Sequence, residues 1–146
     1  MSADIFLVKF ELDSNSAYVD GMSDLVESVS VPSDIFRSLV AGTDAAKLSK
    51  LQVFEDESKT ESFEIGCYLP SDVSMLRARL REMFLAKVRD SAAAAGSDSA
   101  IQINVKLLEE MLGELKVITS LDALLTRKLQ GFRDDDSVVV RADINE

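Results

Sequence analysis

The chain has 146 residues, of which 26 are acidic, 16 are basic and none is histidine, so its formal net charge at pH 7 is −10. This charge argues against bulk attraction to nucleic acid or anionic lipid. The missing histidine removes the side chain most used for proton transfer near neutral pH and the commonest metal ligand. Hydrophobic residues make up 47% and charged residues 29% of the chain, which is typical of a globular protein, and the length suits one domain over residues 1–146.

The sequence carries no sign of secretion or of membrane insertion. The first four residues, Met1–Asp4, have no basic lead before an apolar stretch, as a signal peptide would. No run approaches the ~18–20 apolar residues that span a bilayer. The single cysteine, Cys67, excludes an intramolecular disulfide and fits a reducing compartment. We therefore expect a cytoplasmic protein that does not contact membranes.

The first third of the chain predicts two strands and a short helix. Residues 4–13 alternate at period two, with one apolar face made by Phe6, Val8, Phe10 and Leu12. Residues 14–23 are rich in turn formers, and residues 25–31 alternate again. Ser33 is then expected to cap a helix that follows Pro32 and ends near Gly42.

The middle of the chain predicts a hairpin and a long helix. Two strands, residues 48–54 and 61–69, flank a polar loop and are most simply joined as a hairpin. A helix is expected over residues 72–95, after Pro70 and Ser71. Its apolar positions fall within one arc at 100° per residue: Val73, Leu76, Leu80, Met83, Phe84 and Val88.

The last third predicts a short strand at residues 100–104, a helix at 105–118, a further helix capped by Ser120, and a strand at 138–140. Residues 141–146 are expected to form a flexible tail. The element order is therefore ββαββαβααβ. Strand pairs joined by short loops favour a single α+β domain whose antiparallel or mixed sheet carries its helices mainly on one face.

The tripeptide Pro-Ser-Asp occurs twice, beginning at Pro32 and at Pro70. A duplicated strand–strand–helix unit would explain the repeat. The simpler explanation, which we favour, is that this tripeptide suits any helix start, so that the two copies are independent.

No catalytic motif is found in the sequence. Cys67 lies in register with Ile65 and Leu69 and has no histidine to activate it, so we expect a small buried apolar residue there. Serine triads, phosphate loops, dinucleotide fingerprints and Cys/His zinc sites are absent or excluded by counting. Hence no catalytic, cofactor-binding or metal-binding residue is assigned, and no cofactor is expected.

Two runs of acids are the remaining candidates for chemistry or for partner contact. Glu55, Asp56 and Glu57 form the expected hairpin tip. Asp134, Asp135 and Asp136 follow a predicted helix and could hold Mg²⁺ or Ca²⁺. In both cases a solvated loop is the simpler interpretation, and either run could contact another protein.

The long predicted helix is locally basic. Between Arg77 and Arg89 it carries five basic residues and one acid, including Arg79 and Arg81. Phosphate binding is one interpretation, but no aromatic residue is interleaved with these bases for stacking. A solvated face, or a face that docks against the acidic part of another chain, is the favoured interpretation.

Three functions remain open. The favoured one is a non-catalytic protein–protein interaction or assembly module whose partner is another protein or a second copy, because the first seventy residues hold thirteen acids and only five bases. The contact residues expected are the two acidic runs together with Arg77, Arg79, Arg81 and Arg89. The second is a small acidic inhibitor or nucleic-acid mimic, such as a phage or mobile-element accessory protein. The third is a carboxylate-dependent enzyme with Mg²⁺.

Overall fold

The computed structural model describes residues 1–95 and 105–146. Its elements, in chain order, are β1 (Ser2–Leu12), β2 (Tyr18–Val31), α1 (Ser33–Val40), β3 (Ser49–Phe54), β4 (Ser62–Tyr68), α2 (Pro70–Ala95), α3 (Val105–Thr126), the π-helical turn η1 (Arg127–Gly131) and β5 (Val138–Asn145). The chain is thus the single α+β domain expected from its sequence.

The five strands form one mixed sheet that closes on itself, because β5 pairs with both β4 and β1. β1 pairs antiparallel with β2 and with β5 over most of its length, and these three strands make a long blade. β3 and β4 pair antiparallel and make a short blade. The blades are joined at two narrow junctions of two residue pairs each, β2 with β3 in parallel and β4 with β5 antiparallel.

The outer face of the long blade is covered by the three helices, as the sequence predicted. Alternate residues of β1 (Ala3, Ile5 and Leu7) face this layer. The helices contribute the buried residues Ile35, Phe36 and Leu39 of α1, Val73, Leu76, Leu80 and Met83 of α2, and Ile118, Leu121, Leu124 and Leu125 of α3. Each large apolar side chain buried in this layer contributes about 1.5–3 kcal/mol to folding, so this interface is the main source of stability.

The inner face of the closed sheet holds a second, smaller core. Phe10, Val53, Ile65, Cys67 and Val139 are buried there. The rings of Phe10 and Tyr18 meet edge to face, with their centroids 5.9 Å apart. Cys67 is 6% exposed and belongs to this core, which confirms the prediction of a buried apolar role. β1 therefore buries residues on both of its faces, with even-numbered positions turned inward.

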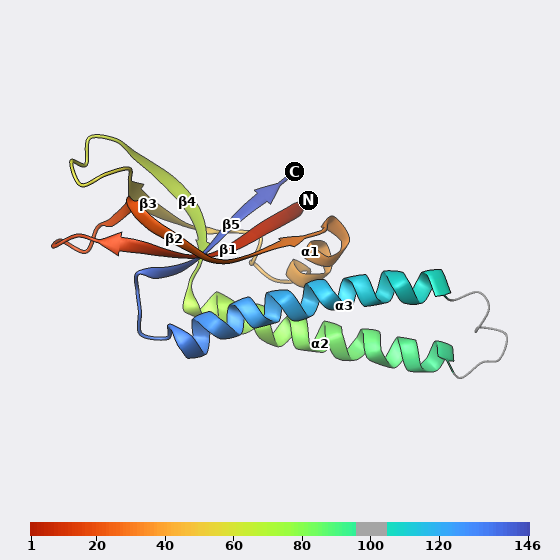
Figure 1. The fold of residues 1–146 in the computed structure, drawn as a ribbon. Helices are drawn as coiled ribbons and strands as arrows, with labels where there is room; N and C mark the ends of the chain where they lie inside the picture. The colour runs from red at the N-terminus through yellow and green to blue at the C-terminus, as the bar shows by residue number, and fades with distance from the viewer. Residues whose placement is uncertain (96–104) are drawn as a thin grey trace.

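The helices α2 and α3 lie side by side as an antiparallel hairpin. Figure 1 shows that the far half of this hairpin extends beyond the sheet and beyond α1. The near half packs on the sheet and on α1, where Arg79 donates to the Ser38 carbonyl at 3.2 Å. The far half has no sheet beneath it, which matters for what its side chains can bind.

The structure corrects several element boundaries. β2 begins at Tyr18, so most of the segment expected to be turns is a strand. Ser120 caps no helix, because α3 runs without a break from Val105 to Thr126. At α1 the N-cap is Pro32, not Ser33, and no side chain caps that helix. The strand expected at residues 100–104 lies outside the described residues.

The expected tail is also wrong for residues 141–145. Arg141–Asn145 form the second half of β5 and pair with β1, from Arg141 opposite Phe6 to Asn145 opposite Ser2. Ala142 is buried against the helix layer, and this burial together with the backbone ladder explains why the segment is ordered. In the sequence, the charged residues Arg141 and Asp143 on either side of Ala142 hid the alternating pattern of a strand.

Candidate functional site

The arginines of α2 diverge and do not form one binding site. Arg77 and Arg81 turn toward α3, where both approach one oxygen of Asp122, at 4.0 and 3.3 Å. Arg79 turns the other way, toward α1, and also pairs with Glu82. Arg89 is exposed farther along the helix. Arg79 and Arg81 thus have carbonyl or carboxylate partners, whereas the buried Nε of Arg77 has no hydrogen-bond partner among the described residues. The four cations therefore point to different neighbours.

The acidic run Glu55–Glu57 occupies the exposed tip of the β3–β4 hairpin, as expected. A hydrogen bond with Glu61, followed by repulsion from Glu61 and, more weakly, from Asp56 and Asp20, raises the pKa of Glu55 above its usual range. Asp56 accepts hydrogen bonds from the backbone and the hydroxyl of Ser58. The tip therefore combines the negative charge of the β3–β4 hairpin with that of Asp20 in β2.

The second acidic run serves mainly to order the loop that leads into β5. Asp135 accepts hydrogen bonds from the Ser137 hydroxyl and backbone, which lower the pKa of Asp135. The buried Lys128 donates to the carbonyls of Phe132 and Asp135, at 3.1 and 2.9 Å. Burial lowers the pKa of Lys128, although the carboxylates of Asp135 and Asp136 oppose this shift.

Metal binding by these acids gains no support from the geometry. Across residues 1–95 and 105–146, no three or more Cys, Asp or Glu side chains are grouped so that they could hold a metal ion. Asp134 and Asp136 are exposed, and the Asp136 carbonyl accepts a hydrogen bond from the Tyr18 hydroxyl at 2.8 Å. The loop tethers the start of β2 to the end of the helical hairpin.

The far half of the α2–α3 hairpin carries exposed apolar side chains on both helices. Leu85 and Val88 of α2 are 53% and 41% exposed, and Leu108 and Leu112 of α3 are 45% and 64% exposed. Residues 81, 84, 85 and 88, like residues 108, 112, 115 and 119, follow the three- and four-residue spacing that puts side chains on one face of a helix. Each helix therefore has an exposed stripe that is mainly apolar and that ends at Arg81 on α2 and at Thr119 on α3.

A groove between the two helices joins one end of each stripe, and the helical spacing from Thr119 places Leu112 and Leu108 on the same side of α3. It has a volume of about 380 Å³, and its walls include Arg81, Phe84 and Leu85 of α2 and Thr119 of α3. Leu80 and Ile118 lie at its base, while Asp122 links the two sides. We call the surface made by Phe84, Leu85, Val88, Leu108 and Leu112 the hairpin face. Because α1 contacts α2 through Arg79 on another side, the hairpin face is left uncovered by the described residues.

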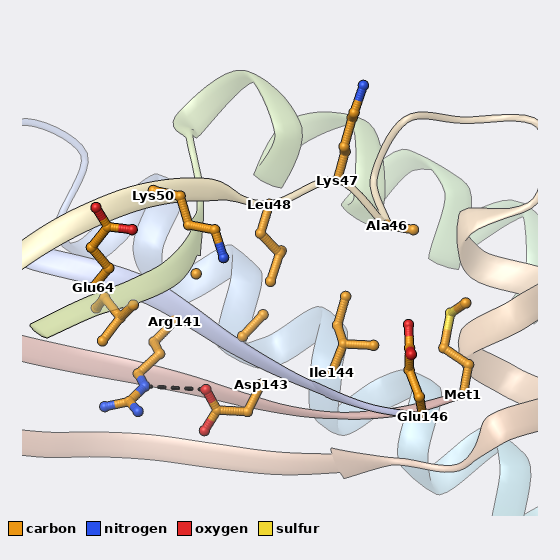
Figure 2. Close-up of a pocket in the computed structure, with 13 residues that line it drawn as sticks. Met1, Ala46, Lys47, Leu48, Lys50, Glu64, Arg141, Asp143, Ile144 and Glu146 are labelled. Atoms are coloured by element: carbon orange, nitrogen blue, oxygen red, sulfur yellow. Dashed lines mark hydrogen bonds and ion pairs between the residues drawn. The ribbon is translucent and has the colours of Figure 1, made fainter.

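A second hollow lies in the sheet, where the long and short blades separate (Figure 2). It has a volume of about 630 Å³ and lies between β5 on one side and β4 with the start of β3 on the other. Figure 2 shows Lys50 and Glu64 over one end of it, near the Arg141–Asp143 pair, whose Nε–Oδ1 distance is 3.4 Å. We call this hollow the blade cleft.

Comparison with known proteins yields no match to any protein family, any curated protein or any solved structure. The surfaces described above are therefore the basis on which a function can be assigned.

Sequence reasoning missed the hairpin face. The helical pattern predicts that Val88 faces inward and that Leu108 and Leu112 belong to one wide apolar face, but all three are exposed. The available signal was that this apolar face is too wide for one helix contact.

None of the helices in the described ranges is long and apolar enough to cross a membrane.

Proposed function

We propose that this protein is a non-catalytic interaction module that assembles with a second copy through the hairpin face. The observation that carries this proposal is the concentration of four exposed large apolar side chains on one projecting hairpin. Scattered exposed leucines need no explanation, but a contiguous apolar stripe on two helices is typical of a protein interface.

The charges of the two helices favour a second copy as the occupant. Arg89, one turn beyond Leu85, is exposed on α2, and Glu109, beside Leu108, is exposed on α3. A two-fold axis parallel to the helices would place α2 of each copy over α3 of the other. Opposite charges then face each other at both contacts, around an apolar centre.

The experiment is light scattering coupled to size exclusion over a range of protein concentrations. The wild-type chain is expected to approach twice its 16.0 kDa mass as the concentration rises. The double variant Leu85→Asp/Leu112→Asp should stay at 16.0 kDa, because it places two carboxylates in the apolar contact. Met22→Asp is the control, since Met22 is 77% exposed on β2, away from the hairpin.

Charge reversal tests the arrangement of the helices. Arg89→Glu and Glu109→Lys each reverse one exposed residue, on α2 and on α3. Each change alone should weaken the dimer, and the chain carrying both should recover it, because an acidic α2 would then face a basic α3. If α2 instead packs on α2 of the partner, each residue faces its own copy, so neither single change weakens the dimer and the combined chain has nothing to recover. A wild-type chain of 16.0 kDa at every concentration would refute self-assembly.

A second candidate, an acidic inhibitor that binds a basic site on another protein, is favoured by the exposed tip of the β3–β4 hairpin, where Glu55, Asp56 and Glu57 follow one another. Glu55, Asp56 and Glu61 are held close enough to repel one another, as carboxylates that imitate a row of phosphates would be. Binding of this kind must weaken steeply as salt is added. Replacing Glu55 and Glu57 with glutamine should abolish it and leave the hairpin dimer unchanged.

A further inference from the structure

A third hollow lies at the base of the helical hairpin, and we propose that it binds a phosphate group, as the free ion or as the end of a small ester. It has a volume of about 560 Å³ and is lined by the first two turns of α2, by η1 and by the loop after η1. Figure 1 shows that α2 begins at the same end of the hairpin where α3 ends. We call this hollow the basal pocket. The hairpin face lies farther along both helices, so this proposal does not depend on self-assembly.

The charge of the basal pocket selects an anion. Arg77 of α2, Lys128 of η1 and Arg133 of the following loop all line it. Within the described part of the chain, Asp134 is the single acid that lines it. Three cations and one acid leave the lining with a formal charge of +2, although the net charge of the whole chain is −10. A concave surface lined by one sign of charge focuses the field and concentrates ions of the opposite sign.

Arg77 is the cation of this pocket that most lacks a partner. Its side chain is 21% exposed, and its buried Nε lies 4.0 Å from Asp122 Oδ1. That oxygen is closer to the Nε of Arg81, at 3.3 Å. No group of the Arg77 guanidinium donates a hydrogen bond to any residue that the structure describes. A guanidinium has five N–H donors and is costly to bury without acceptors, so an oxygen anion in the pocket would stabilise it.

The other donors of the pocket favour phosphate over a carboxylate. Ser71 and Ser74 lie one helical turn apart on α2, and neither hydroxyl has a hydrogen-bond partner in the described ranges. The Ser71 N–H is also free, because the first hydrogen bond of α2 runs from the Val73 N–H to the Leu69 carbonyl. The Asp72 carboxylate is not part of the lining and accepts from the Leu69 N–H at 3.2 Å. A phosphate group offers three strongly accepting oxygens to such donors, and a helix start adds positive potential.

The remaining lining supplies fixed charge and an apolar wall. Lys128 is 7% exposed, and its ammonium is held beside the pocket by the carbonyls of Phe132 and Asp135. It therefore contributes its charge without having to move toward a ligand. Pro70 and Leu129 are the apolar part of the wall. The volume falls in the range of about 300–1,000 Å³ typical of small-molecule pockets, which leaves room for an organic group beside the phosphate.

The test is isothermal titration calorimetry of the full chain at about 20 mM NaCl, where charge interactions are only weakly screened. The probes are inorganic phosphate, phenyl phosphate and benzoate. Both phosphates should bind with a Kd below about 1 mM. Benzoate should bind about tenfold more weakly, because it has one charge and two oxygens. A lower Kd for phenyl phosphate than for inorganic phosphate would identify an ester as the ligand, and equal Kd values would identify the free ion.

Matched substitutions locate the site. Arg77→Gln and Arg133→Gln should each weaken phosphate binding about tenfold, because each removes a charged donor. Arg37→Gln is the control, since it removes the same charge from an exposed position on α1 that does not line the pocket, and it should leave the Kd unchanged. Asp134→Asn removes the opposing charge and should tighten binding about threefold, a gain that a poorly folded chain cannot produce.

Two further measurements separate this site from the hairpin face. The amide proton of Ser71 should move downfield in NMR spectra as phosphate is added, because its N–H gains an acceptor. The Leu85→Asp/Leu112→Asp chain should bind phosphate as the wild type does, so loss of the dimer and loss of the pocket are told apart.

Four results would overturn the proposal. They are the absence of saturable binding of either phosphate up to about 10 mM, benzoate binding as tight as that of phenyl phosphate, equal Kd values for the Arg77→Gln, Arg133→Gln and Arg37→Gln chains, and an Asp134→Asn chain that binds no more tightly than the wild type. Circular dichroism of each variant establishes that the fold is retained before binding is compared.

Discussion

Gly66 is the position where the close contact between the blades can be tested by one methyl group. A Cβ at residue 66 would overlap Leu48 Cδ1 and lie 3.1 Å from the Ala142 carbonyl oxygen. Overpacking of this kind costs about 1–3 kcal/mol. The lower entropy of the unfolded chain with alanine returns about 0.5–1 kcal/mol. The two ranges differ by about 0–2.5 kcal/mol, so we expect Gly66→Ala to lower the free energy of unfolding by about 1 kcal/mol.

The assay is chemical denaturation followed by circular dichroism, with a matched glycine as control. A Cβ added to Gly113, inside α3, would meet nothing within 4 Å, and the φ of this glycine is not positive, so Gly113→Ala should raise stability by about 0.5–1 kcal/mol. The two substitutions add the same methyl group and should act in opposite directions. Each 1 kcal/mol corresponds to about 3–4 °C in Tm for a chain of this size.

A double-mutant cycle identifies the overlapping atom. Leu48→Ala removes Cδ1, so Gly66→Ala should cost about 1 kcal/mol less in that background than in the wild type. The Ala142 carbonyl remains close, so the cost should not vanish. If Gly66→Ala is neutral or stabilising, or if the two substitutions do not couple, Leu48 and Ala142 do not pack against Gly66 as closely as described.

Three further predictions concern groups with shifted pKa values. Lys128→Met should destabilise by about 1–3 kcal/mol in urea titrations, because two carbonyls lose a charged donor while the desolvation of the ammonium is relieved; equal stability would mean that the loop 132–135 does not need this lysine. Glu61→Gln should return the pKa of Glu55 toward 4.5 in NMR titrations. Because the pKa of Glu55 is raised in the folded wild type, the free energy of unfolding falls as the pH rises through that pKa, and this pH dependence should disappear in the variant. Burial, with a smaller effect of Asp72, raises the pKa of the Cys67 thiol, so a thiol reagent should modify Cys67 only as the protein unfolds; equal rates in native and denatured protein would contradict its place in the inner core.

Elements whose apolar residues alternate along a strand, or recur at helical spacing, could be predicted from the sequence. Phe63, Ile65 and Cys67 mark β4, and Leu76, Leu80 and Met83 mark the buried stripe of α2. In contrast, the sequence pattern starts β2 too late, because Asp20, Gly21 and Ser23 are poor strand formers. Pairing with β1 overrides their preference, from Tyr18 opposite Leu12 onward.

The candidate surfaces could not be predicted, because each depends on tertiary placement. Leu85 and Leu112 look like core residues until the hairpin is seen to extend past the sheet (Figure 1). The blade cleft depends on where β4 and β5 stop pairing, which no local pattern records. Arg141 and Asp143 give a charged character to a segment whose strand pairing is long-range.

The pairing of β1 with β5 joins the first strand of the sheet to the last, with Ser2 opposite Asn145. Such a ladder closes late, because all the intervening elements must be synthesised before its second strand exists. Until then β1, which has apolar residues on both faces, is shielded on one edge only, by its hairpin with β2. Efficient production of this protein should therefore depend on how quickly the nascent chain reaches β5, and truncation before Val138 should yield aggregates rather than a smaller folded unit.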